Sequence, residues 1–143
     1  MRALQARLAA HGVPFGHWTF LRILWERDGL TQRGLSTEAG VSEPTTVAAL
    51  RAMEKAGYVT RSQAERNRKN VYVYLTPKGR ALKAKLVPLA VEVNEIGLAG
   101  VSAADRAATQ RTLLAIIDNL RDKTREPFAD PSSPRKRGPR LRS

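Results

Sequence analysis

The residues best suited to chemistry in this chain are three cations grouped in one short polar stretch. Arg66, Arg68 and Lys69 lie in the segment AERNRK, around the start of the alternating aromatic and aliphatic run NVYVYL. A guanidinium offers a planar fork of N–H donors and an ammonium a compact charge, so both groups suit phosphate oxygens. Alternation of this kind predicts a β-strand. The pattern therefore indicates cations at the tip of a β-hairpin, where they could bind a polyanion.

The overall charge favours the same kind of partner. The 143-residue chain carries 25 Lys and Arg residues against 13 Asp and Glu residues, a formal net charge of +12. Such an excess points to nucleic acid first and to an anionic membrane surface second. Residues 125–143 hold six of the cations and two of the acids, so +4 belongs to that Pro- and Ser-rich tail and +8 to the rest. The tail has little to bury, and we predict that it is disordered.

Other classes of function lack the residues that they need. The chain has no cysteine, which excludes disulfides, zinc–thiolate sites and thiol redox switches. His11 and His17 do not have the spacing of metal ligands on one helix face, and no nucleophile motif, acid pair or phosphate-binding glycine loop is present. No apolar run reaches the roughly 18 residues of a membrane span. We therefore predict a soluble cytoplasmic protein that is not an enzyme, needs no metal or cofactor and has no membrane partner.

Two predicted helices upstream of the hairpin are joined by a very short turn. Thr31 suits an N-cap and Gly40 a C-terminal stop, so the first helix lies between them. The second helix begins after Ser42, another N-cap residue, with Pro44 in its first turn, and it ends at Gly57. Helices connected in this way make a helix-turn-helix candidate.

The second of these helices has a small outward face. At 100° per residue, one face groups mainly apolar side chains: Thr46, Val47, Leu50 and Met53. The opposite face is small, hydroxylated and basic: Thr45, Ala48, Ala52 and Lys55. A stripe of small side chains lets a helix backbone come close to a groove edge, although alanine also occurs simply because it favours helix.

Further helices are predicted at both ends, over residues 1–12, 77–98 and 102–124, so the predicted fold is mainly α with a small β-hairpin. Thr76 and Ser102 suit the N-caps of the last two. The last two helices carry more apolar side chains at helical spacing than a small body needs, which predicts a seam for a partner helix. The predicted interface residues are Leu4, Leu8, Leu82, Leu86, Leu89, Val93, Ile96, Leu113, Ile117 and Leu120.

The order of these elements resembles the MarR family of bacterial transcription regulators. The resemblance rests on LTQRGLSTEAGVSEPTTVAALRAMEKAGYVTR for the helix-turn-helix and on NRKNVYVYLTPKGR for a basic wing and its exit, and it covers about residues 4–123. It implies a single domain over residues 1–124, with a winged helix-turn-helix at about 15–78 and the three other helices forming a dimerisation region. The basic tail at 125–143 lies outside the resemblance.

The resemblance also implies a double-stranded DNA site read by a homodimer. The residues that match the family's DNA contacts are Ser42, Thr45, Thr46, Arg51 and Arg68. We also expect the neighbouring wing cations Arg66 and Lys69 to bind DNA. Arg68 matches the arginine that enters the minor groove from the wing. The chain has Asn67 beside it, where the family usually has a carboxylate.

A small-molecule effector is the last implication of the resemblance, often an aromatic acid or an acyl-thioester conjugate. It would bind between the dimerisation helices and the DNA-binding part, with His11, Phe15, His17, Trp18 and Arg22 as candidate lining residues. Aromatic residues such as Phe15 and Trp18 are more often plain core residues than ligand contacts. The expected function is a ligand-responsive repressor at a pseudo-palindromic site. The alternative is a constitutive architectural DNA-binding protein of low specificity that has no effector.

Overall fold

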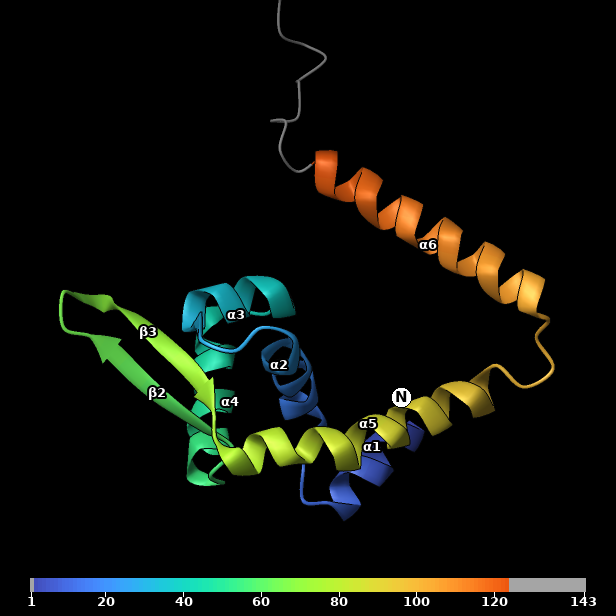
Figure 1. The fold of residues 1–143 in the computed structure, drawn as a ribbon. Coiled ribbons are helices and arrows are strands. Elements are labelled where there is room, and N and C mark those ends of the chain that lie inside the picture. The colour runs from blue at the N-terminus through green and yellow to red at the C-terminus, as the bar shows by residue number, and fades with distance from the viewer. Residues whose placement is uncertain (1, 124–143) are drawn as a thin grey trace, which may run out of the picture. The chain divides into compact units, whose positions relative to one another are not determined.

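The computed structural model describes residues 2–123 of the chain (Figure 1). The chain divides into two compact units, Met1–Gly97 and Leu98–Ser143, where the sequence predicted one domain over residues 1–124. The predicted disordered tail at 125–143 lies outside the described residues. Within residues 2–123, no helix is long and apolar enough to cross a membrane.

The first unit contains five helices and a small sheet among its described residues. Its helices are α1 (Arg2–Ala10), α2 (Phe15–Glu26), α3 (Gln32–Ala39), α4 (Glu43–Lys55) and α5 (Pro77–Gly97). The sheet has the antiparallel order β1-β3-β2, formed by β1 (Leu30–Thr31), β2 (Val59–Ala64) and β3 (Asn67–Leu75). The predicted fold class, mainly α with a small β-hairpin, is confirmed. The two-residue strand β1 is too short to show any alternation, and the sequence did not predict it.

Local capping forms the helix-turn-helix as the sequence indicated. Thr31 Oγ1 accepts a hydrogen bond from the Gly34 amide at 3.0 Å, so α3 begins at Gln32. Gly40 ends α3 with a φ of 66°, a left-handed conformation that a residue without a Cβ adopts at little cost. Ser42 Oγ then accepts from the Thr45 amide at 3.3 Å and begins α4. The turn is short because each helix end is satisfied by its own cap.

The core of the first unit holds these helices in place. It lies between α2, α3 and α4, with contributions from α1, the sheet and α5. Its fully buried members are Leu8, Val13, Leu21, Leu24, Leu35, Leu50, Met53, Val59, Val73 and Leu86. Complete burial of one leucine side chain contributes about 1.5–3 kcal/mol. The inner face of α4 is therefore fixed and its outer face is left to solvent.

The start of α5 is locked against the helix-turn-helix. A Cβ on Gly79 would lie 2.1 Å from the Tyr58 carbonyl oxygen, so only glycine allows this approach. The indole Nε1 of Trp25 donates to the Gly79 carbonyl at 3.0 Å, and Arg80 Nη2 donates to Asp28 Oδ2 at 3.1 Å. Three contacts therefore join the first turn of α5 to α2, to the loop after it and to the α4–β2 turn.

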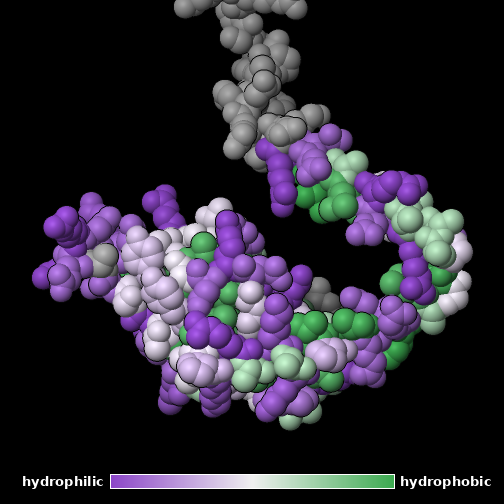
Figure 2. Space-filling model, in the orientation of Figure 1, coloured by the Kyte–Doolittle hydropathy of each residue, from purple (hydrophilic) through white to green (hydrophobic). Residues whose placement is uncertain are grey.

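The second unit contains one described helix, α6 (Ala103–Lys123). Ser102 Oγ accepts from the Asp105 amide at 3.1 Å and forms the predicted N-cap. Large apolar side chains are exposed on this helix, and Figure 2 shows hydrophobic atoms at its surface. They are Leu113, Leu114, Ile116, Ile117 and Leu120.

The predicted dimer residues fall into two groups. Leu8, Leu82 and Leu86 are buried inside the first unit, where α1 packs on α5, so their prediction as interface residues was wrong. Helical spacing showed that they face another helix but could not show that this helix belongs to the same chain. Leu4, Leu89 and Val93 are half-buried. Four remain exposed: Ile96, Leu113, Ile117 and Leu120.

Candidate nucleic-acid interface

The outer face of α4 is small and exposed, as its spacing predicted. Thr45, Ala48 and Ala52 are all exposed, and so is Arg51 beside them. At the N-terminus of the helix, Ser42 Oγ lies 2.8 Å from Thr45 Oγ1. The first amides of a helix lack partners within it and carry a partial positive charge, so this end suits a phosphate or a base edge. The face offers close approach, two hydroxyls and two cations, Arg51 and Lys55.

Thr46 does not belong to this face, and its prediction as a DNA contact was wrong. It is fully buried. Its hydroxyl donates to the Ser42 carbonyl at 3.1 Å and lies 2.8 Å from Ser36 Oγ, which is itself buried on α3. At 100° per residue, Thr46 lies on the same face of α4 as the apolar residues, and that face is the buried one. The side chain holds the two helices of the motif together instead of meeting a ligand.

The wing formed by β2 and β3 projects beyond the helices of the first unit (Figure 1). Its cations lie at or next to the turn that joins the two strands. Arg66, Arg68 and Lys69 are exposed. Asn67 Oδ1 accepts from the Lys69 amide at 3.2 Å, which shapes the turn. Within residues 2–123, no hydrogen bond or ion pair holds the guanidinium of Arg66 or Arg68. Both groups are available to an anion, and Asn67 orders the backbone in place of a carboxylate beside Arg68.

A polar cluster at the base of the wing was missed by the sequence analysis. Arg61 on β2 contacts Glu54 in the last turn of α4 and Gln32 at the start of α3. The hydrogen bond from Arg61 holds the pKa of Glu54 below its usual range. The only sequence signal was a pair of opposite charges on either side of the Gly57 turn, and pairing across a turn follows from tertiary structure.

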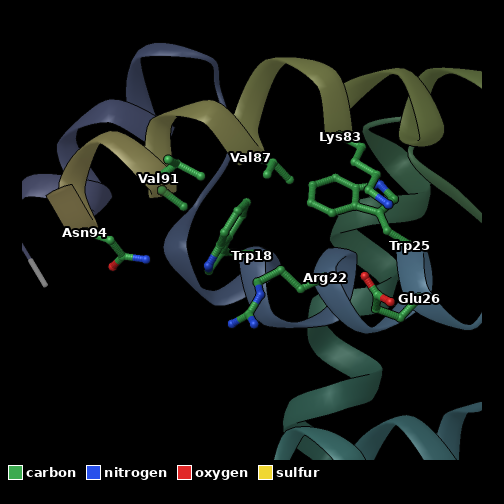
Figure 3. Close-up of a pocket in the computed structure, with 9 residues that line it drawn as sticks. Trp18, Arg22, Trp25, Glu26, Lys83, Val87, Val91 and Asn94 are labelled. Atoms are coloured by element: carbon green, nitrogen blue, oxygen red, sulfur yellow. The ribbon is translucent and has the colours of Figure 1, made fainter. Parts of the chain in front are cut away.

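A pocket of about 280 Å³ lies between α2 and α5 (Figure 3). Trp18 and Trp25 form its aromatic wall, edge to face, with ring centroids 5.8 Å apart. Arg22 Cζ lies 5.9 Å from the centroid of Trp18, and Lys83 brings a second cation from α5. The pocket thus combines an aromatic wall with two cations and one acid, Glu26.

The five candidate effector residues are not brought together. Trp18 and Arg22 line the α2–α5 pocket, Phe15 and His17 line a hollow against α3 and α4, and His11 lines a third hollow beside Tyr58. The shared lining stays a prediction for His11, Phe15 and His17, which lie at these other hollows. Burial lowers the pKa of His17. Helix assignment alone could not show which side of α2 meets α5.

A helix-turn-helix followed by a basic two-stranded wing defines the winged-helix class of DNA-binding domains. Residues 16–71 match the model of the MarR family. A crystal structure of transcriptional regulator PA3341 is 32% identical to this chain, with a TM-score of 0.71, and the match covers 83% of this chain and 88% of that one. The chain belongs to the MarR family.

Two further comparisons also match the chain to transcription regulators. The chain is 29% identical over 119 residues to the HTH-type transcriptional regulator TtmR of Methylorubrum extorquens, a match that covers 83% of this chain and 60% of TtmR. The chain thus spans less than two thirds of that relative. The crystal structure of a MarR transcriptional regulator from Methanosarcina mazei Go1 is 27% identical, with a TM-score of 0.75 and coverage of 83% and 86%.

The buried position of Thr46 leads to a stability prediction. Thr46→Val keeps the shape of the side chain but removes the hydroxyl that joins α4 to Ser36, so we expect the free energy of unfolding to fall by about 1 kcal/mol. Urea denaturation measures it. Thr45→Val is the matched control on the exposed face and should cost less. Equal losses in the two variants, or a Thr46→Val protein of unchanged stability, would contradict the buried role.

Proposed function

We propose that this chain is a sequence-specific DNA-binding transcription regulator that acts as a homodimeric, ligand-responsive repressor. The observation that carries the proposal is the pairing, within one unit, of the small exposed face of α4 with a wing whose cations have no partner among residues 2–123. A buried or ion-paired surface would not suit a polyanion. Transcription regulators among the relatives support the same function.

The two surfaces are suited to different parts of a duplex. In the proposed complex α4 enters the major groove, where Ser42 and Thr45 meet phosphates and base edges and Arg51 meets the backbone. The wing reaches an adjacent minor groove with Arg68, while Arg66 and Lys69 neutralise phosphates. An arginine suits a narrow minor groove because the negative potential is strongest there. Thr46 is left out because its hydroxyl is already bonded.

A second copy of the chain is the proposed partner of the exposed apolar residues. Five large apolar side chains on α6, together with Ile96 near the end of α5, are between 43% and 61% exposed. Isolated helices are marginal in water, and an amphipathic helix gains most of its stability by burying its apolar face. A two-fold dimer would bury these residues and present two copies of α4 to half-sites about 34 Å apart on a pseudo-palindromic site.

The α2–α5 pocket is the proposed effector site. Its tryptophans offer faces to an aromatic ring, and Arg22 and Lys83 offer charge to a carboxylate or to the phosphates of an acyl-thioester conjugate. Lys83 and Val87 precede Pro88 on α5, whereas Ala90, Val91 and Asn94 follow it. Proline cannot donate a helix hydrogen bond, so α5 bends most easily there. A ligand touching both sides of Pro88 would change that bend. It would thereby change the separation of the two copies of α4, the recognition helices of the proposed dimer.

Loss of the wing arginine provides the first test. Arg68→Ala should weaken binding to a duplex selected from a random library and lower the slope of log Kd against log salt by about 1 for each wing. Fluorescence anisotropy over a salt series measures both. Lys85→Ala, which removes one exposed charge from α5, is the control and should change binding less. Equal wild-type affinity for the selected duplex and for random DNA would favour the architectural alternative.

Dimerisation is tested on the exposed face of α6. Ile117→Asp places a charge among the apolar residues and should give monomers in light scattering. Affinity for the selected duplex should fall roughly tenfold or more, because two linked DNA contacts become one. Ala115→Asp is the matched control, because it places the same charge on the opposite side of the helix, roughly 200° away. A dimeric Ile117→Asp protein would show that α6 is not the interface.

The effector site is tested with two probes that differ in charge, benzoate and benzamide. We expect benzoate to raise the thermal midpoint of the wild-type protein because the carboxylate pairs with Arg22 while the ring lies against the tryptophans. Arg22→Gln should weaken benzoate binding about tenfold, equivalent to about 1.4 kcal/mol, and leave benzamide binding nearly unchanged. An equal loss for both probes would mean that Arg22 does not recognise the acid.

A further inference from the structure

Among the described side chains at the base of the wing, Arg61 is the one that hydrogen-bonds to both helices of the helix-turn-helix. Its Nη2 and Nε donate to Glu54 Oε2 at 2.7 and 3.1 Å, and its Nη1 donates to Gln32 Oε1 at 3.3 Å. Its backbone amide also donates to Glu54 Oε1 at 3.3 Å. Both carboxylate oxygens of Glu54 thus accept hydrogen bonds from Arg61. The guanidinium donates to Oε2, and the backbone amide donates to Oε1.

The position of Arg61 matters because the wing is weakly held further out. Arg61 pairs with Val73 on β3, and Val73 in turn pairs with Leu30 on β1, so the three-stranded part of the sheet lies at this level. Beyond it the two strands continue alone, and their register shifts between Gln63 and Ala64. A two-stranded hairpin has little stability of its own. The direction of the wing is therefore set near Arg61.

The recognition helix is fixed at the same point. Glu54 lies in the last turn of α4, whereas the proposed groove contacts of α4 begin at Ser42 and Thr45. An angular change between α4 and β2 would move the wing tip relative to those contacts. The side chain of Arg61 is 22% exposed and that of Glu54 is 39% exposed, so water only partly screens the pair. Convergence of two N–H groups on one oxygen restricts the angle more than a single ion pair would.

We propose that Arg61 is a positioning residue for DNA recognition: through Glu54 and Gln32 it sets the angle between the wing and the recognition helix, and so the register between major-groove and minor-groove contacts. This inference rests on the proposed function. It differs from a direct phosphate contact, because each guanidinium nitrogen of Arg61 already donates to a protein acceptor. It also differs from a purely stabilising ion pair, because its effect should pass through Arg68.

A double-mutant cycle on two DNA lengths tests the inference. The ligands are the duplex selected from a random library and a version trimmed of the flanks that the wings would reach. Arg61→Met should weaken binding to the full duplex about tenfold and binding to the trimmed duplex less than about twofold. In an Arg68→Ala background, Arg61→Met should cause a smaller loss on the full duplex than it causes alone, because only the phosphate contacts of Arg66 and Lys69 remain to be displaced. Arg61→Lys keeps the charge but not the converging donors, so it should behave like Arg61→Met.

Two controls keep the result interpretable. Arg33→Met removes another arginine that is paired to a glutamate, Glu43, but whose side chain is 87% exposed. This variant should keep the wild-type difference in affinity between the full and the trimmed duplex. Glu54→Gln is the milder variant if Arg61→Met unfolds, and it should show the same dependence on DNA length. Equal losses on both duplexes, additive losses with Arg68→Ala, or full binding by Arg61→Lys would overturn the inference. If instead the wild type does not prefer the selected duplex, or Arg68→Ala has no effect, the proposed function fails and the inference falls with it.

Discussion

The packing of α4 against α2 and α3 is the constraint on which the rest of this structure depends. Leu50 and Met53 are fully buried on one side of α4, and Thr46 extends that side with a hydrogen-bonded hydroxyl. Because the inner face is full, the opposite face needs no large side chains and can remain a stripe of threonine and alanine. A helix that serves a groove must be held from behind, and here apolar burial supplies that hold.

Ion pairs and unpaired cations occupy different parts of the first unit. Three acids of the first unit are used where elements join: Glu54 with Arg61, Asp28 with Arg80, and Glu92 with Arg7. The wing tip, by contrast, carries cations with no acid bonded to them among residues 2–123. With a net charge of +12 the chain repels itself. Binding a polyanion relieves that repulsion, whereas a neutral partner would not.

Features that depend on neighbouring residues were predictable from the sequence, and features that depend on packing were not. The caps at Thr31, Ser42 and Ser102 and the stop at Gly40 each involve residues a few positions apart, so their patterns are visible in the chain. The burial of Leu86 within its own subunit and the division of the candidate effector residues depend on which face of a helix meets which neighbour. Arg61 was missed for the same reason, since its acceptors lie on two other elements.

The course of α5 suggests how the proposed parts would act together. Its first turn cannot move independently of the helix-turn-helix, because Gly79 lies against the Tyr58 carbonyl and is held by Trp25. Its middle lines the α2–α5 pocket on both sides of Pro88, and its end carries the exposed Ile96. Trp25 belongs both to that pocket and to the lock on Gly79. A ligand against this ring would therefore act on the joint that carries the recognition helix, with no need for a path through the rest of the core.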